Sequence, residues 1–242
     1  MVINKFIFIV LVILIYIYIN QEHHKVHPYG YPYLIEKDDF LSETTCEQIS
    51  KKLLESSYTV KDQGFSVYFD DAPDVEENFI KHDLKCIYDI FKSVREPKTN
   101  SYVCNVMLVP VCNDDSDKEV SVGGHYDGSA EVTDIFGKYY MPLCTSVVYL
   151  QVPKSFTGGE LFLKKHEHDG IYKEIPPKPG KYVRFRGDMF HGVNRIYSND
   201  KTYRLSIVFE QYIIPVKKPK FVVQDIFTEW EYDETTGTYN YL

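Results

Sequence analysis

Two histidines, one aspartate and one arginine are spaced in a way that could support chemistry. His125 and Asp127 are separated by one residue, His191 follows 64 positions after the aspartate, and Arg204 comes 13 positions later. Alternation along a strand would point residues 125 and 127 to the same side. A neighbouring strand could supply His191 as a third ligand, so the set could hold a metal ion.

Two imidazoles and one carboxylate on one face of a metal leave three adjacent positions open, an arrangement typical of non-haem Fe(II) oxygenases. Open positions indicate catalysis rather than a structural role. Each residue alone has another explanation: most His-x-Asp triplets lie at protein surfaces, and His191 could be a hydrogen-bonded core or loop histidine. The ordered series with Gly123-Gly124 and Gly158-Gly159, which allow close backbone approach, favours a site.

Arg204 lies in an apolar run between Tyr203 and Leu205. Alternation places its guanidinium among core residues, and a buried arginine needs an anionic partner. That partner could be a bound ligand or a carboxylate of the protein itself. Arg195 and Lys201 are rival cations, but both lie in or beside a polar turn where solvated charges are expected.

The elements that must position these residues are predicted to be mainly strands. Aromatic residues make up 15% of the 242 residues, which suits pleated, half-buried surfaces. After residue 100, short β-type runs are separated by turn residues. These runs are 102–111, 120–126, 143–152, 160–163, 182–186 and 203–214. They predict an α+β domain with a double-sheet barrel or jelly-roll core.

Two amphipathic helices are predicted before the strands, and both should pack on a sheet. The first begins with a capping-box pair, Thr44 and Glu47, and presents an apolar face of Cys46, Ile49 and Leu53. The second carries one apolar stripe and ends at Pro97. The stripe consists of Ile80, Leu84, Ile87, Phe91 and Val94.

Residues 1–20 are predicted to form a transmembrane signal anchor. The 18 residues from Val2 are almost all apolar, and as a helix they would span about 27 Å, close to the ~30 Å of a bilayer core. A cleaved signal peptide is the alternative, although the run ends in Tyr and Asn residues without a small-residue cleavage site. Lys5 weakly places the following domain on the lumenal side. We therefore expect a single-pass membrane protein with an endoplasmic-reticulum-like location.

Charge and cysteine content argue against other classes of protein. The chain has 27 basic and 35 acidic residues, a net charge of −8, and no Lys/Arg-dense run, so nucleic acid is not an expected partner. Its five cysteines form no C-x-x-C pair, which argues against a zinc knuckle.

The expected organisation is an anchor at 1–20, a tether at 21–40, a catalytic domain at 41–228 with its core at 101–214, and an acidic, Tyr-rich tail at 229–242.

Residues 101–214 resemble the catalytic core of the Fe(II)/2-oxoglutarate dioxygenases, in the branch of the prolyl 4-hydroxylases and related procollagen hydroxylases. The matching pieces are His125-Tyr126-Asp127, Thr145-Ser-Val-Val-Tyr-Leu, Gly158-Gly159-Glu160-Leu161, Pro179-Gly180, His191-Gly-Val and Arg204-Leu-Ser. The resemblance implies a double-stranded β-helix, or jelly-roll, core with supporting N-terminal helices. It also implies that His125, Asp127 and His191 bind Fe(II) and that Arg204 grips the far carboxylate of 2-oxoglutarate, with Tyr149 and Thr145 as candidates to assist.

The activity implied by the resemblance is hydroxylation of an unactivated C–H bond with O₂, coupled to decarboxylation of 2-oxoglutarate to succinate and supported by ascorbate. A membrane-anchored, lumenal member would act on proline in Pro-rich or collagen-like chains, because extended Pro-rich peptides dock against aromatic grooves. Lysyl hydroxylation and a small-molecule substrate are alternatives within the class. Two alternatives lie outside this class of hydroxylases: a cupin-type metal protein, and an inactive membrane-tethered binding domain that keeps the fold.

Overall fold

The computed structural model describes residues 32–61, 63–111, 120–128, 140–200, 202–215, 220–224, 230–233 and 238–241. The chain divides into two compact units, Met1–Pro32 and Tyr33–Leu242. The predicted anchor, residues 1–20, lies outside the described residues. Among the described residues, no helix has the length and apolar character needed to cross a membrane.

The second unit consists mainly of antiparallel strands with few helices. Its larger sheet has seven strands, in the order β1 (Leu34–Lys37), β9 (Tyr182–Arg186), β5 (Cys144–Gln151), β12 (Tyr203–Tyr212), β3 (Ser101–Pro110), β2 (Gly64–Asp70) and β13 (Phe221–Gln224). Its smaller sheet has four, in the order β4 (Val120–His125), β10 (Phe190–Asn194), β7 (Leu161–Lys164) and β8 (Lys173–Ile175). A short pair joins β6 (Thr157–Gly158) to β11 (Ile196–Tyr197), and a hairpin joins β14 (Trp230–Asp233) to β15 (Thr238–Tyr241). The helices in the described part of the chain are α2 (Glu43–Leu54), α3 (Val75–Lys81) and α4 (Lys85–Val94).

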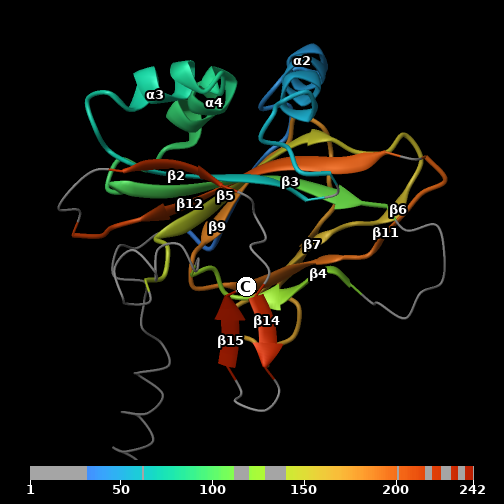
Figure 1. Cartoon of the computed structure of the whole chain (residues 1–242). Helices are drawn as coiled ribbons and strands as arrows, with labels where there is room; N and C mark the ends of the chain where they lie inside the picture. Colours follow the sequence, from blue (N-terminus) through green and yellow to red (C-terminus); the bar gives the residue numbers. More distant parts are fainter. Residues whose placement is uncertain are drawn as a thin grey trace, which may run out of the picture. The chain divides into compact units, whose positions relative to one another are not determined.

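The larger sheet is buried on both faces. On β5, Val148 belongs to an apolar cluster that includes Leu53 of α2. The neighbouring Val147 packs instead with Leu161 of the smaller sheet, as alternation along the strand requires. The three helices therefore cover one face of the larger sheet, and the smaller sheet lies against the other (Figure 1). This double-sheet arrangement confirms the predicted jelly-roll core.

Helix α2 begins one residue before the predicted cap. Ser42, not Thr44, is its N-cap residue, because Ser42 has the extended backbone that this position needs and its Oγ accepts a hydrogen bond from the Thr45 backbone N–H at 3.1 Å. The predicted capping pair was therefore wrong by two positions. Cys46 and Leu53 are buried in the core, as predicted from their shared face.

The single helix predicted over residues 80–94 is wrong, because the backbone breaks between α3 and α4. Asp83 has a φ of 56°, a left-handed conformation that Asp tolerates and that ends a helix. The Leu84 N–H closes the turn by donating to the Phe79 carbonyl at 2.8 Å. As a result Ile80 is 53% exposed and Phe79 is buried in its place.

The described fold starts before the boundary expected at residue 41. Strand β1 lies within residues 21–40, which were assigned to a tether, and it pairs with β9 at the edge of the larger sheet. Near the C-terminus, residues 230–233 and 238–241 pair as a hairpin within the segment predicted as an acidic, Tyr-rich tail.

Candidate functional site

Two antiparallel strands of the smaller sheet bring the histidines together. His191 on β10 pairs in register with His125 on β4, and the centroids of their rings are 4.4 Å apart. A Cβ on Gly124 would lie 2.4 Å from the Phe190 ring, whereas one on Gly123 would meet nothing within 4 Å. Of the two glycines, only Gly124 therefore leaves space that a neighbouring side chain, the Phe190 ring, occupies.

Asp127 completes the cluster immediately after β4. Its Oδ1 atom lies 3.6 Å from His125 Nε2 and 3.3 Å from His191 Nε2. One ligand atom from each of the three residues lies within 4.8 Å of the others. This spacing allows all three to contact one ion at distances of about 2.0–2.2 Å. The fold thus brings together three residues that span 67 positions of the sequence, from 125 to 191 inclusive.

Both imidazole rings are oriented by backbone carbonyls. His125 Nδ1 lies 2.8 Å from the Gly123 oxygen, and His191 Nδ1 lies 3.1 Å from the Met189 oxygen. A carbonyl oxygen can only accept, so in each neutral ring Nδ1 carries the proton and the lone pair of Nε2 faces Asp127. Metal-binding histidines are oriented in this way by the hydrogen bond of their second ring nitrogen.

Thr145 holds the aspartate in this position. Its Oγ1 donates to Asp127 Oδ2 at 2.5 Å, from β5 of the larger sheet. This is a contact with a potential metal ligand, whereas the sequence predicted a contact with the co-substrate. It leaves Oδ1 as the oxygen of Asp127 that faces the two histidines.

The electrostatics of the cluster keep the aspartate ionised. Burial by itself would raise the pKa of Asp127, but interactions with His191 and His125 outweigh it and hold that pKa well below its usual range. Burial also opposes charge on His125, yet the Asp127 carboxylate gives that imidazole a raised pKa. An anionic carboxylate between two ring nitrogens is the electrostatic environment that a divalent cation requires.

Arg204 faces the same cavity from β12, and it is 3% exposed. Its guanidinium carbon lies 5.1 Å from the centroid of the Tyr149 ring. Its Nη1 donates to the carbonyl of Gly159 at 3.4 Å. Gly159 belongs to the Gly158-Gly159 motif that the sequence predicted to be part of the site. Burial lowers the pKa of Arg204, because desolvation disfavours its charged form. A bound anion would offset that cost.

Three buried polar atoms near this guanidinium lack a hydrogen-bond partner among the described residues: Arg204 Nε, Tyr149 Oη and Ser206 Oγ. Ser206 pairs with Tyr149 in the β12–β5 register, and alternation puts it on the same face of β12 as Arg204. Unsatisfied buried groups are costly, and a carboxylate ligand accepts such donors. Ser206 was not predicted as a site residue, although its two-residue spacing from Arg204 was the signal that could have found it.

One cavity of about 250 Å³ joins the metal cluster to Arg204. Its walls are partly apolar, with Val147, Phe185 and Val208, and partly polar, with Asn105 and Glu210. The sequence did not predict any of these lining residues. The arrangement places three potential metal ligands and one buried cation around a single enclosed space, which fits an Fe(II) ion and a small dicarboxylate.

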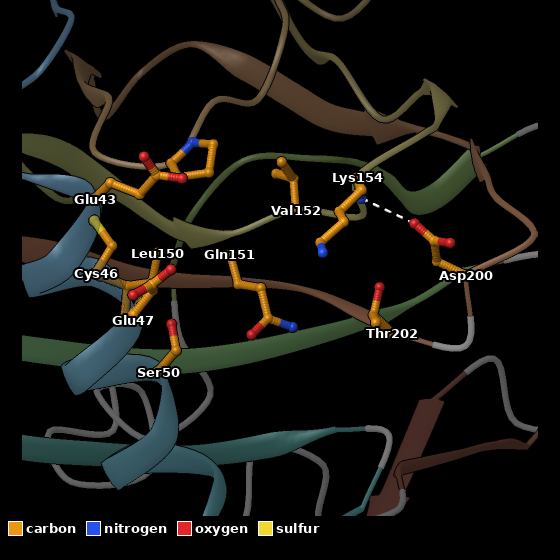
Figure 2. A pocket seen from close by; sticks show the side chains of 11 residues that line it. Glu43, Cys46, Glu47, Ser50, Leu150, Gln151, Val152, Lys154, Asp200 and Thr202 are labelled. Carbon is orange, nitrogen blue, oxygen red and sulfur yellow. Dashed lines mark hydrogen bonds between the residues drawn. The ribbon is translucent and has the colours of Figure 1, made fainter.

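A larger cavity of about 580 Å³ lies between α2 and the end of β5 (Figure 2). Glu43, Glu47 and Ser50 of the helix line one side, and across from them the backbone N–H of Lys154 donates to Asp200 at 3.0 Å. Leu150 lines this cavity, whereas Val147 lines the one with the metal cluster. The two cavities therefore open on opposite faces of β5, and the larger one contains none of the clustered ligands.

Of the two rival cations, Arg195 does not line the cavity of the metal cluster. Arg195 is buried, contrary to the solvated position that was expected, and its guanidinium carbon lies 5.0 Å from the centroid of the Tyr197 ring. It is not among the residues around the metal cluster. Lys201 lies outside the described residues.

No protein-family model and no curated protein sequence matches this protein, but solved structures do. A structure of IDO from Bacillus thuringiensis is 13% identical with a TM-score of 0.52, and the match spans 78% of this chain and 94% of that one. A Pseudomonas putida prolyl-4-hydroxylase is 13% identical with a TM-score of 0.43, over 75% of this chain and 93% of its own length. The viral collagen prolyl hydroxylase vCPH from Paramecium Bursaria Chlorella virus-1, in its 2OG complex, is 18% identical with a TM-score of 0.42, over 74% of this chain and 95% of its own length.

At these identities the likeness concerns the fold. Among the other matches, one is described as an oxidoreductase of the 2OG-Fe(II) oxygenase family from Burkholderia pseudomallei, at 14% identity and a TM-score of 0.44. The match to the Bacillus thuringiensis structure, with a TM-score of 0.52, shows a shared fold. This chain therefore has a double-sheet, jelly-roll fold, which it shares with the Bacillus thuringiensis structure.

Proposed function

We propose that this protein is an Fe(II)- and 2-oxoglutarate-dependent hydroxylase. The observation that carries the proposal is the single cavity shared by the His125, Asp127 and His191 cluster and the buried guanidinium of Arg204. Bound Fe(II) would supply O₂ chemistry in which one oxygen atom enters succinate, formed with CO₂ from 2-oxoglutarate, and the other converts a substrate C–H into C–OH.

The protein's own residues orient the metal. Nε2 of both histidines and Oδ1 of Asp127 would hold it. The carbonyls of Gly123 and Met189 fix the rings, and Thr145 fixes the carboxylate. Such supporting hydrogen bonds set both the direction and the basicity of metal ligands.

The co-substrate would be held from the opposite end of the cavity. Arg204 would donate to the distal carboxylate of 2-oxoglutarate, with Tyr149 Oη and Ser206 Oγ as further donors. The proposal is supported by the unsatisfied donors at these three positions. The apolar wall of Val147, Phe185 and Val208 would keep water from the reacting carbon.

Of the two rival functions, only the cupin-type metal protein leaves Arg204 without a role. A cupin-type metal protein would use the histidines and the aspartate but has no need of a buried guanidinium in the same cavity. An inactive binding domain would bind the ligand without turnover. Formation of succinate from 2-oxoglutarate therefore separates the proposal from both.

We propose that the substrate is a polypeptide. The sequence resemblance favours proline in a Pro-rich or collagen-like polypeptide, with lysine as the alternative. The enzyme would be membrane-anchored through residues 1–20, with its domain in an endoplasmic-reticulum-like lumen and ascorbate maintaining the iron. The two side chains differ chemically in one respect that a protein can recognise: lysine carries a cation with three donors, and a prolyl residue within a peptide has no N–H.

Succinate formation by the full-length protein tests the proposed function. With Fe(II), 2-oxoglutarate and ascorbate we expect succinate, and with a Pro-Gly repeat peptide mass spectrometry would report added oxygen. His191→Ala removes one of three ligands and should abolish both metal binding and succinate formation. His168→Ala, on an exposed turn, is the matched control. A folded, iron-supplied wild type that makes no succinate would overturn the proposal.

A further inference from the structure

The cavity between α2 and the end of β5 has no part in the proposed function, yet it has the size of a ligand site. Its volume of about 580 Å³ lies within the range of roughly 300–1,000 Å³ that is usual for such sites. The helix lines it with Glu43, Cys46, Glu47 and Ser50 (Figure 2). Their spacing of three, one and three residues puts them on one face of the helix. One face of α2 therefore turns both charged and buried groups toward the same space.

Ser50 is the buried group in this lining that points to a ligand. It is 3% exposed, and its Oγ has no hydrogen-bond partner among the described residues. A serine inside a helix can satisfy its hydroxyl on the carbonyl four residues earlier, but Ser50 makes no such bond. An unsatisfied buried hydroxyl costs free energy. A ligand in the cavity that reaches Ser50 would remove that cost.

The charges around the cavity favour a cation. Glu43 and Glu47 are exposed, and neither forms an ion pair within the described part of the chain. Asp200 is the third carboxylate, and its Oδ2 accepts hydrogen bonds from the backbone N–H groups of Lys154, at 3.0 Å, and Ser155, at 3.3 Å. Of the described residues that line the cavity, only Lys154 carries an opposing charge. Carboxylates therefore outnumber ammonium groups around this space.

A single metal ion does not fit this distribution of charge. Among the described residues, the cluster around His125 is the one group of three potential ligands whose atoms lie within 4.8 Å of one another. Glu43 and Glu47 are one helical turn apart, about 6 Å along the axis. Figure 2 shows Asp200 on the opposite side of the cavity from both of them. A complementary ligand therefore carries its positive charge at several points along a molecule.

The rest of the lining suits the carbon chain and the N–H groups of such a molecule. Gln151 Nε2 donates to the carbonyl of Tyr203 at 3.3 Å, which leaves the side-chain oxygen of Gln151 as an acceptor. Apolar surface is provided by Leu150, Val152 and Pro179. Methylene groups pack along such surface while the charged ends of the same chain remain at polar groups, as they do in lysine side chains.

We propose that this cavity binds an organic cation with several amino groups, the chemical class of the polyamines. Its ammonium groups would donate to Glu43, Glu47 and Asp200, and a further N–H would donate to the Oγ of Ser50. The inference goes beyond the proposed function and does not depend on it. The cavity lies on the face of β5 opposite to the metal cluster and shares no lining residue with the cavity of that cluster.

Calorimetric titration of the full-length protein with spermidine tests the proposal. We expect binding at low salt that weakens at high salt, because charges near the surface are screened. Octanediol, an uncharged molecule of similar length, should not bind. Glu47→Gln should weaken spermidine binding about two- to fivefold, the range for one exposed ion pair. The matched control is Glu55→Gln, an exposed carboxylate at the end of α2 outside the cavity, which should leave the affinity unchanged. Lys154→Met removes the opposing charge and should tighten binding.

Ser50→Ala separates a ligand contact from a structural role. Alanine removes the unsatisfied hydroxyl and is the better helix former, so the Tm of the ligand-free protein should stay the same or rise. Spermidine should nevertheless bind about two- to tenfold more weakly, because one hydrogen bond is lost. A hydroxyl with a structural partner would lower that Tm when removed, and this result would contradict the role of Ser50.

Three other results would overturn the proposal: no binding of spermidine at about 1 mM and low salt, the same affinity in Glu47→Gln as in Glu55→Gln, or weaker binding in Lys154→Met. Competition between spermidine and Mn(II) with 2-oxoglutarate would also overturn it, because the amine would then occupy the cavity of the metal cluster. Succinate formation is measured separately. Its absence contradicts the proposed function and leaves the amine site untouched.

Discussion

Replacing Arg204 with Met distinguishes a ligand clamp from a structural ion pair. Methionine keeps much of the side-chain length and removes the charge. In the described part of the protein, the guanidinium contacts the carbonyl of Gly159 and the ring of Tyr149, neither of which is a carboxylate. The structure therefore predicts that the loss will appear in 2-oxoglutarate binding and not in the stability of the ligand-free protein.

The expected free-energy changes differ clearly between a ligand clamp and a structural ion pair. Loss of two hydrogen bonds to a charged ligand, each worth at least about 1.5 kcal/mol, costs about 3 kcal/mol, or roughly 150-fold in affinity. Breaking a buried ion pair costs about 3–5 kcal/mol of folding stability, whereas removing a buried charge that lacks an ionic partner is close to neutral or stabilising. Arg184→Met is the matched control, because Arg184 Nη2 lies 2.5 Å from Glu96 Oε2 in a largely buried ion pair.

Thermal unfolding with and without 2-oxoglutarate, in the presence of Mn(II), measures both quantities. A ligand at a hundred times its Kd adds about 2.7 kcal/mol, which raises Tm by roughly 5–10 °C in a domain of about 200 residues. At the same concentration, Arg204→Met should show a rise below about 1 °C with an unchanged ligand-free Tm. Arg184→Met should lose ligand-free stability and keep the rise. If Arg204→Met behaves like Arg184→Met, the assignment of Arg204 as the clamp is refuted.

Two further predictions concern the metal. Thr145→Val removes the hydrogen bond to Asp127 and should weaken Mn(II) binding about tenfold or more, while Thr145→Ser should keep it; equal affinities in equilibrium dialysis would contradict the contact. Metal binding should also weaken as the pH falls: an imidazole must lose its proton to bind, and the raised pKa of His125 makes proton competition begin above the ordinary value of about 6.5. Calorimetric titrations of Mn(II) at pH 8, 7 and 6 measure this effect, and an affinity that is constant over the range would show that His125 is not a ligand.

Much of the fold follows from short-range patterns. The strands that carry Thr145 and Arg204 were predicted within one or two residues, because period-two alternation and turn residues define them locally. The break at Asp83 was not predicted, because the apolar stripe continues across it. A single residue in the left-handed conformation does not change the spacing of the apolar residues. Strand β1 was missed as well, since its pairing with β9 joins segments about 150 residues apart.

The sequence alone determined which residues could form the site, through their types, their order and the resemblance they carry. His125, Asp127 and Arg204 could be nominated because chemistry limits which side chains bind metals and carboxylates. The tertiary structure decided what surrounds them. Thr145 lies against Asp127, and Glu210 lies in the same cavity, because neighbouring strands of the larger sheet pair in a particular register. Register depends on packing between distant segments, so no local pattern could place these side chains beside one another.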